Sequence, residues 1–125
     1  MKKIISTDKA PAAIGPYSQA IEVGNMVFTS GVIPVVPATG EIPEGIEAQA
    51  KQAIGNLVAL LNEAGVKTED VIKTTVFIKN MDDFALINKV YETYFEKPYP
   101  ARSCVEVAKL PKGVLIEIEA IAVKR

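Results

Sequence analysis

The sequence has 125 residues, with 14 Lys and Arg against 15 Asp and Glu, one Cys and no His. Without His and with a single Cys, it cannot assemble the usual side-chain sets for zinc, copper or haem, and Ser-His-Asp and Cys-His catalysis are both excluded. A net charge of -1 provides no general attraction to nucleic acid or to an anionic membrane.

The length of the chain indicates one domain, and the features that it lacks indicate the cytoplasm. Met1, Lys2 and Lys3 are followed by only two apolar residues, which is not the pattern of a signal peptide. No apolar run approaches the roughly 18 residues of a membrane span. A lone Cys argues against a disulfide framework and fits a reducing interior. We therefore expect a single domain over residues 1–125, in the cytoplasm and without a membrane partner.

The first half of the chain predicts a hairpin and a long helix. Strands at residues 19–23 and 26–31 flank a turn at Gly24 and Asn25, and a loop rich in Pro and Gly covers residues 34–45. Apolar residues then recur every three to four positions from Ile46 to Ala64, which predicts a helix. Gly65 follows as a residue that readily adopts positive φ and ends it.

The second half predicts three strands and another helix. Residues 71–78 are β-branched and apolar, with Ile72, Val76 and Ile78 expected on one face. Asp82 or Asp83 is expected to cap a helix that runs to about residue 95. Strands at 101–109 and 114–123 flank a turn at residues 111–113. The order ββαβαββ predicts an α+β fold in which two helices pack on one face of a mixed sheet.

The last strand bears on assembly. Residues 114–123 are apolar on both faces except for Glu117 and Glu119. Two helices cover one face of a sheet, so the other face needs a partner, and the simplest partner is a second copy of the chain. We therefore expect a homo-oligomer.

Arg102 is the first candidate site residue. Strand alternation puts Arg102, Cys104 and Glu106 on one face, and Cys is rare on exposed faces. A cleft there would let the planar guanidinium bind an anionic group through two hydrogen bonds. The alternative is an Arg that extends along a sheet edge or pairs with Glu106.

Glu117 and Glu119 are the second candidate. The turn at residues 111–113 is expected to place their strand beside that of Arg102, which would be the nearest cation. A carboxylate in that place can orient water or act as a general base. The alternative is a solvated face, or an ion pair that stabilises the sheet.

Four further residues have two interpretations each. Cys104 is either a nucleophile or a small buried apolar residue. Tyr17 is either a lid over apolar surface or the wall of a site, and Ser30 either reaches a ligand or belongs to a turn. Asn88 is either plain surface or a donor in a pocket. The Gly residues have no phosphate-binding spacing, so no nucleotide cofactor is supported.

Several stretches carry a family resemblance that covers essentially the whole chain. They are residues 15–20 (GPYSQA), 28–34 (FTSGVIP), 73–77 (KTTVF), 100–107 (PARSCVEV) and 116–122 (IEIEAIA). With these motifs the chain resembles the RidA (YjgF/UK) family. The resemblance implies a chorismate-mutase-like α+β fold, assembled as a homotrimer whose sheets form a central barrel with the helices outside.

The resemblance also implies an activity without a cofactor or a metal: hydrolysis of reactive 2-imino acids, such as 2-iminobutanoate and 2-iminopropanoate, to 2-oxo acids and ammonia. Arg102 would hold the substrate carboxylate, Glu117 would position and activate the attacking water, and the backbone at Cys104 would help to hold the water or the imine nitrogen. The pocket between subunits would be lined by Tyr17, Ser30, Gly31 and Asn88.

One departure and two alternatives remain. The connection at residues 96–100 is shorter than in many family members, which bears on the pocket rim and substrate preference. One alternative is a regulatory protein that binds small carboxylates without turnover. The other is an endoribonuclease or translation inhibitor, for which the sequence has no His and no basic patch with interleaved aromatic residues.

Overall fold

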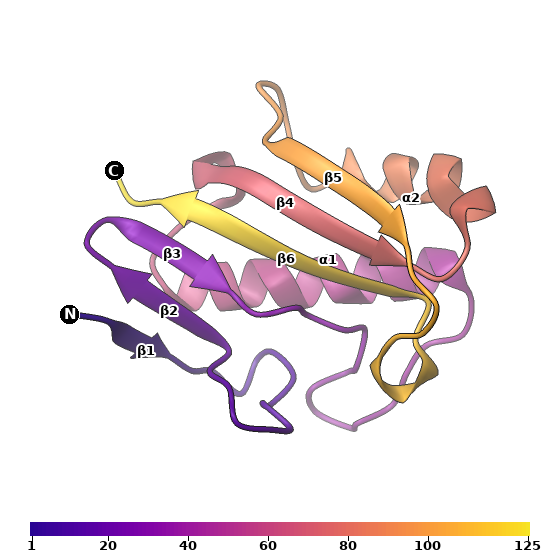
Figure 1. The fold of residues 1–125 in the computed structure, drawn as a ribbon, viewed down its shortest axis with the longest axis horizontal. Helices are drawn as coiled ribbons and strands as arrows, with labels where there is room; N and C mark the ends of the chain where they lie inside the picture. The colour runs from indigo at the N-terminus through magenta and orange to yellow at the C-terminus, as the bar shows by residue number, and fades with distance from the viewer.

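Six β-strands form one mixed sheet in the order β1-β2-β3-β6-β4-β5 (Figure 1). The computed structural model describes all residues from Met1 to Arg125. The β4–β5 pair is parallel, and the other pairs are antiparallel. The elements in chain order are β1 (Lys3–Ile5), β2 (Ala20–Val23), β3 (Met26–Thr29), α1 (Ile46–Glu63), β4 (Val71–Ile78), α2 (Phe84–Tyr91), β5 (Ala101–Glu106) and β6 (Ile116–Val123).

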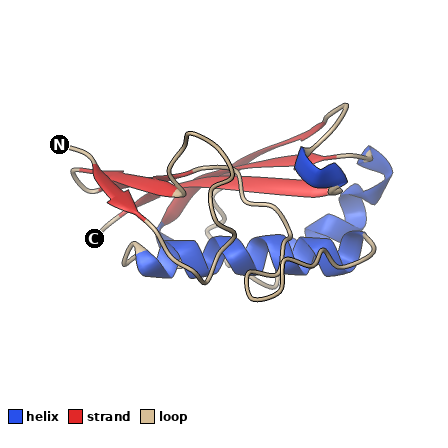
Figure 2. Cartoon of the chain, turned by 90° about the horizontal axis from the view of Figure 1, so that it is seen from below, coloured by secondary structure: helices blue, strands red, loops and turns tan.

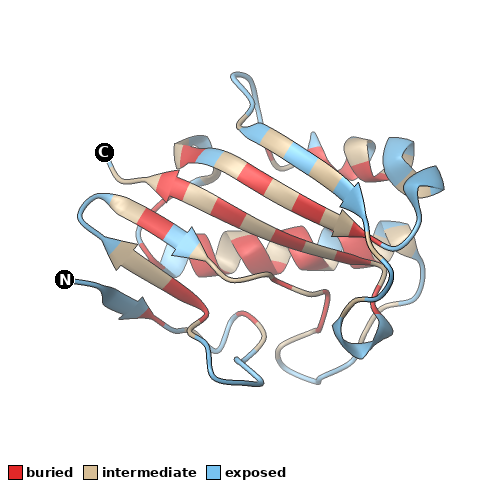
Figure 3. Ribbon diagram, viewed as in Figure 1, coloured by how far each residue is buried: buried red, intermediate tan, exposed pale blue.

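Both α-helices lie on the same face of the sheet (Figure 2). The core fills the space between the helices and the sheet. Burial alternates along β6, where every second residue from Ile116 to Ala122 is buried (Figure 3). The large buried side chains of α1 pack against this face: Ile54, Leu57, Leu60 and Leu61. The predicted α+β fold with two helices on one face of a mixed sheet is thus confirmed. The opposite face, which we call the open face, carries no α-helix.

Several elements agree with the sequence-based prediction. The hairpin of β2 and β3 turns at Gly24 and Asn25, and β4 has the predicted bounds. The long helix α1 ends at Glu63, and Gly65 follows with φ 83°. That conformation is strained for residues with a Cβ, so Gly65 marks the end of the helix.

The helix predicted to run to about residue 95 is shorter, and its N-cap residue makes no side-chain hydrogen bond. Asp83 occupies the N-cap position as predicted. The side-chain cap lies one turn earlier, where the Asp82 N–H donates to the Asn80 side chain at 2.9 Å, at the start of a 3-10 turn over Met81–Asp83. The helix ends at Tyr91 because the next turn tightens. There the Thr93 hydroxyl donates to the Val90 carbonyl at 2.6 Å.

The strand bounds were less accurate at the sheet margins. β5 ends at Glu106, not at residue 109, because β4, its neighbour in the sheet, ends at Ile78. β6 begins at Ile116, since the Leu115 N–H donates to the Gln49 side chain at 2.8 Å and not to a strand. The three-residue β1 was missed because it is ordered by pairing with β2, far away in the sequence.

Two predictions about sheet geometry were wrong. The strands of Arg102 and Glu117 are not neighbours, because β4 lies between β5 and β6. Ile72 does not share a face with Val76 and Ile78, because a β-bulge between Val71 and Lys73 leaves Ile72 exposed.

Candidate functional site

The candidate residues fall into two clusters on opposite faces of the sheet. In the strand register Thr74 pairs with both Arg102 and Ala120, so Arg102 points to the helix-covered face. Glu117 pairs with Phe77, which lies three residues after Thr74 on β4 and therefore on the other face of the strand. Glu117 thus points to the open face. The expectation that Arg102 is the cation next to Glu117 therefore fails within one chain.

The first group, which we call the arginine cluster, consists of Arg102 with Phe84, Asn88, Tyr91 and Tyr99. Arg102, Asn88, Tyr91 and Tyr99 line one hollow together with Glu92 and Pro100. The guanidinium carbon of Arg102 lies 4.9 Å from the ring centroid of Tyr91 and 5.4 Å from that of Phe84. These distances are typical of a cation held by aromatic rings.

Arg102 has no acidic partner within the chain. It takes part in none of the ion pairs, and the Glu106 carboxylate, the alternative partner, instead accepts a hydrogen bond from the Met81 N–H at 2.8 Å. A half-buried guanidinium without a counter-ion is a site for an anion, and its fork of N–H donors suits a carboxylate. This geometry favours the cleft interpretation over an ion pair with Glu106.

Asn88 lies at the same hollow. Its side-chain oxygen is buried and has no hydrogen-bond partner within the chain, so this polar group is available to a ligand. Phe84 and Tyr91, whose rings contact Arg102, are not among the site residues that the sequence indicates. The two residues are seven positions apart and so lie on the same side of α2. That spacing was the signal that could have shown that both rings contact one side chain.

Cys104 shares the face of Arg102 and packs against the core. Burial raises the pKa of its thiol, and the nearby Arg102 offsets this only in part. A thiol with a raised pKa is mostly protonated at neutral pH and is a poor nucleophile. The structure therefore favours the interpretation of Cys104 as a small apolar residue, which is partly buried against the core.

The second group, which we call the glutamate cluster, consists of Glu117 and Glu119 with Tyr17, Ser30 and Gly31. They line a second hollow together with Ile14, Ile33 and Pro111. Burial raises the pKa of the Glu117 carboxyl, and the neighbouring Glu119 raises it further. A carboxylate whose pKa is raised toward neutral is a stronger base, which suits proton abstraction from water.

The absence of a side chain at Gly31 leaves room for the Glu117 carboxylate. A methyl group on Gly31 would overlap the Glu117 carboxylate, so no other residue leaves the carboxylate where it is. Ser30 is held by the fold, because its hydroxyl donates to the Ser18 carbonyl at 2.6 Å. It can therefore offer a ligand only an acceptor. The Tyr17 hydroxyl accepts a hydrogen bond from the Ile14 N–H at 3.3 Å, which folds the ring over this loop.

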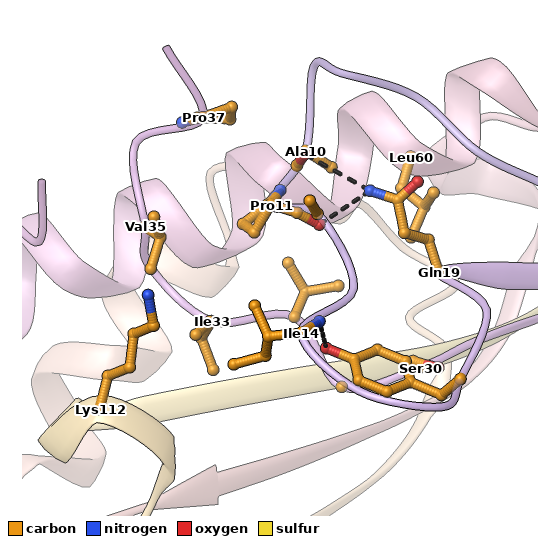
Figure 4. A pocket seen from close by; sticks show the side chains of 14 residues that line it. Ala10, Pro11, Ile14, Gln19, Ser30, Ile33, Val35, Pro37, Leu60 and Lys112 are labelled. Carbon is orange, nitrogen blue, oxygen red and sulfur yellow. Dashed lines mark hydrogen bonds between the residues drawn. The ribbon is translucent and has the colours of Figure 1, made fainter. Parts of the chain in front are cut away.

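An apolar cavity of about 190 Å³ adjoins the glutamate cluster and shares Tyr17, Ser30 and Gly31 with it (Figure 4). Leu60 of α1 and Val35 form part of its wall. The loop over it is fixed by Gln19, whose side-chain N–H groups donate to the Pro11 carbonyl at 2.8 Å and to the Thr7 carbonyl at 3.0 Å. The glutamate cluster thus has a rigid apolar neighbour.

The chain has neither a metal-binding cluster nor a membrane-spanning helix. No three Cys, Asp or Glu side chains lie close enough together to bind a metal ion. Neither helix combines the length and the apolar character that a membrane crossing requires.

Comparison with known proteins identifies the family of the chain. It matches the Endoribonuclease L-PSP family over residues 7–124. It is 56% identical over 128 residues to the 2-iminobutanoate/2-iminopropanoate deaminase of Escherichia coli K12, with 100% of both chains covered. It is 57% identical over 129 residues to a RutC family protein of Haemophilus influenzae, covering 100% of this chain and 99% of that protein.

Solved structures agree over nearly the full length. The crystal structure of Escherichia coli TdcF with bound serine has a TM-score of 0.94 at 54% identity, covering 98% of this chain and 99% of that one. RidA from the Antarctic bacterium Psychrobacter sp. PAMC 21119 also has a TM-score of 0.94, at 47% identity, covering 97% and 98%. The chain therefore belongs to the Endoribonuclease L-PSP family, which is the YjgF/RidA family of the sequence motifs.

Proposed function

We propose that this chain is an imine deaminase that hydrolyses 2-iminobutanoate, 2-iminopropanoate and similar 2-imino acids to 2-oxo acids and ammonia. Full-length relatives at 55–56% identity carry the names of such deaminases. The observation that carries the proposal is the pair of unneutralised groups: Arg102 without a carboxylate partner, and Glu117 with a raised pKa and no cation.

The chemistry needs little more than these two groups. Arg102 binds the substrate carboxylate, and Glu117 takes a proton from a water molecule as that water adds to the carbon of the C=N bond. That proton passes to the nitrogen and gives a carbinolamine. Transfer of the carbinolamine hydroxyl proton to the same nitrogen then lets the C–N bond break, so ammonia leaves as the carbonyl forms. Because an imine carbon is already electrophilic, positioning and one carboxylate base are sufficient. Tyr17, Ser30, Gly31 and Asn88 would line the pocket, and the backbone at Cys104 would help to hold the water or the nitrogen.

The placement of the clusters supports a site shared between copies. Arg102 and Glu117 point to opposite faces of one sheet, so one chain cannot bring both to one small substrate. A homotrimer in which the arginine cluster of one copy meets the glutamate cluster of the next would complete the site. The open face fits that assembly, because the apolar side chains of Phe28 and Val105 are 37% and 42% exposed there. In this arrangement each chain is one domain of a cytoplasmic, chorismate-mutase-like barrel.

The coupled assay with threonine dehydratase tests the function. The dehydratase releases the unstable imine from threonine, and we expect the protein to speed the appearance of ammonia and 2-oxobutanoate. Arg102→Ala is expected to abolish the acceleration, whereas Lys51→Ala, which alters only an exposed ion pair on α1, is expected to preserve it. Equal rates with wild type, with Arg102→Ala and without protein would overturn the proposal.

A second candidate is a binding protein for small carboxylates without turnover. The bound serine in the TdcF structure favours it, since serine also carries a carboxylate and a nitrogen on the adjacent carbon. Tight binding of 2-oxobutanoate in calorimetry together with no deamination would select this function. Salt-dependent RNA binding and cleavage would instead select the endoribonuclease activity that the family description names.

A further inference from the structure

Arg102 is held by aromatic rings and by no acceptor. Its guanidinium carbon lies 4.9 Å from the Tyr91 ring centroid and 5.4 Å from that of Phe84. The two rings are seven residues apart on α2, about two helical turns, and so share one side of the helix. A ring face attracts a cation without occupying its N–H donors. These contacts therefore place the guanidinium and still leave its donors free for a ligand.

Tyr91 is itself tied to the sheet beside Arg102. Its hydroxyl forms a buried hydrogen bond of 2.7 Å with the Thr74 hydroxyl, and Thr74 pairs directly with Arg102 in the β4–β5 register. Its ring also stacks on Phe95, with centroids 4.5 Å apart. Thr74 is fully buried and Tyr91 is 5% exposed, so neither side chain is free to turn. The ring that contacts Arg102 is thus fixed by a hydroxyl on the neighbouring strand.

We infer that Tyr91 is a positioning residue that holds the Arg102 guanidinium ready for a substrate carboxylate, with Phe84 as a weaker second support. The inference rests on the proposed function, in which Arg102 binds that carboxylate. An Arg side chain loses rotamer freedom when it binds an anion, and a chain that is already held loses less. Tyr91 would therefore act on carboxylate affinity and not on the proton transfer at Glu117.

The test measures carboxylate affinity separately from turnover. The Kd for 2-oxobutanoate is measured by calorimetry, and KM and kcat come from the coupled assay. Tyr91→Leu removes the ring and is expected to raise both Kd and KM about five- to tenfold while kcat changes less than about twofold. Tyr91→Phe keeps the ring and is expected to recover most of the lost affinity. Phe84→Leu, at a position 37% exposed, is expected to raise Kd about two- to threefold.

Tyr94→Leu is the matched control, because it makes the same chemical change three residues further along the chain. The Tyr94 hydroxyl contacts the Lys51 carbonyl at 3.3 Å, and its ring makes no contact with Arg102. Its Kd and KM are expected to equal those of the wild type.

Three results would overturn the inference. They are equal Kd values for Tyr91→Leu and Tyr94→Leu, a loss in Tyr91→Phe as large as in Tyr91→Leu, or a fall in kcat without a change in Kd. If Tyr91→Leu fails to fold, the test rests on Phe84→Leu, and an unchanged Kd in that variant is decisive against it. The calorimetric readout needs no turnover. A wild-type protein that binds 2-oxobutanoate but does not deaminate would overturn the proposed function and leave this inference standing.

Discussion

The two faces of the sheet carry clusters of opposite character. The arginine cluster lies on the helix-covered side, where rings of α2 hold a cation that has no acidic partner. The glutamate cluster lies on the open face, where burial and a second carboxylate raise the pKa of Glu117. The Arg102 guanidinium has no carboxylate partner, and the Glu117 carboxylate has no cation next to it. Because the two clusters point to opposite faces of the sheet, one chain cannot bring them to the same small substrate, and the proposed function needs a second copy to join them.

The largest effect is expected at the glutamate cluster. Glu117→Gln keeps the size of the side chain and removes the base, so kcat is expected to fall by a factor on the order of 10² to 10⁴ while KM changes little. Steady-state kinetics in the coupled assay measure both. A KM effect without a kcat effect would reassign Glu117 to substrate binding and erase the contrast between the clusters.

The next effect concerns the arginine cluster. Arg102→Lys keeps the charge but loses the planar fork, so KM is expected to rise about ten- to a hundredfold, with a smaller change in kcat. Retention of wild-type KM would show that only charge matters there. The cation–aromatic geometry would then have no role in recognition.

A pair of glycine variants tests whether the position of Glu117 matters. Gly31→Ala must push the Glu117 carboxylate aside, and kcat is expected to drop about tenfold or more. Gly55→Ala is the control, because a methyl group there meets only ordinary contact with Tyr94. That change is expected to keep kcat and to add about 0.5–1 kcal/mol to the free energy of unfolding, since Gly weakens helix interiors. Equal kcat values in the two variants would contradict the placement.

The smallest effect is a shift in pH dependence. Catalysis needs ionised Glu117, so activity falls as pH drops through its pKa, which lies above the ordinary value for Glu. Glu119→Gln removes the repulsion that raises this pKa further, so the acid limb of kcat/KM is expected to move to lower pH. A limb that stays in place, or moves to higher pH, would separate Glu119 from the titration of Glu117.

The sequence predicted individual helices and strands better than it predicted which strands lie side by side in the sheet. The β-branched run of β4 and the periodic apolar residues of α1 are local signals, and both elements were found where expected. The turn at residues 111–113 also looked local, yet β5 pairs with β4 in parallel and β6 enters between β4 and β3. That strand order depends on long-range packing, and it overturned the expected contact between Arg102 and Glu117.

The same limit applies to the site. Arg102 and Glu117 were identifiable because a cation beside a Cys and two carboxylates in an apolar strand are unusual. The support of Arg102 by Tyr91 and Thr74 was not, since it joins a helix and two strands that are far apart in the chain. Strand alternation does place the two charged groups on opposite faces, but only once β4 is known to lie between them.

A subunit-mixing experiment tests the central claim most directly. Arg102→Ala and Glu117→Gln chains, each inactive alone, are combined by co-expression or by refolding from a mixture, and deamination of 2-iminobutanoate is measured. A site shared between neighbouring copies of a trimer predicts recovery of about one quarter of wild-type activity, because about three quarters of random trimers are mixed and each mixed trimer has one intact site of three. Mixed oligomers that stay as inactive as the parent variants would contradict the shared site.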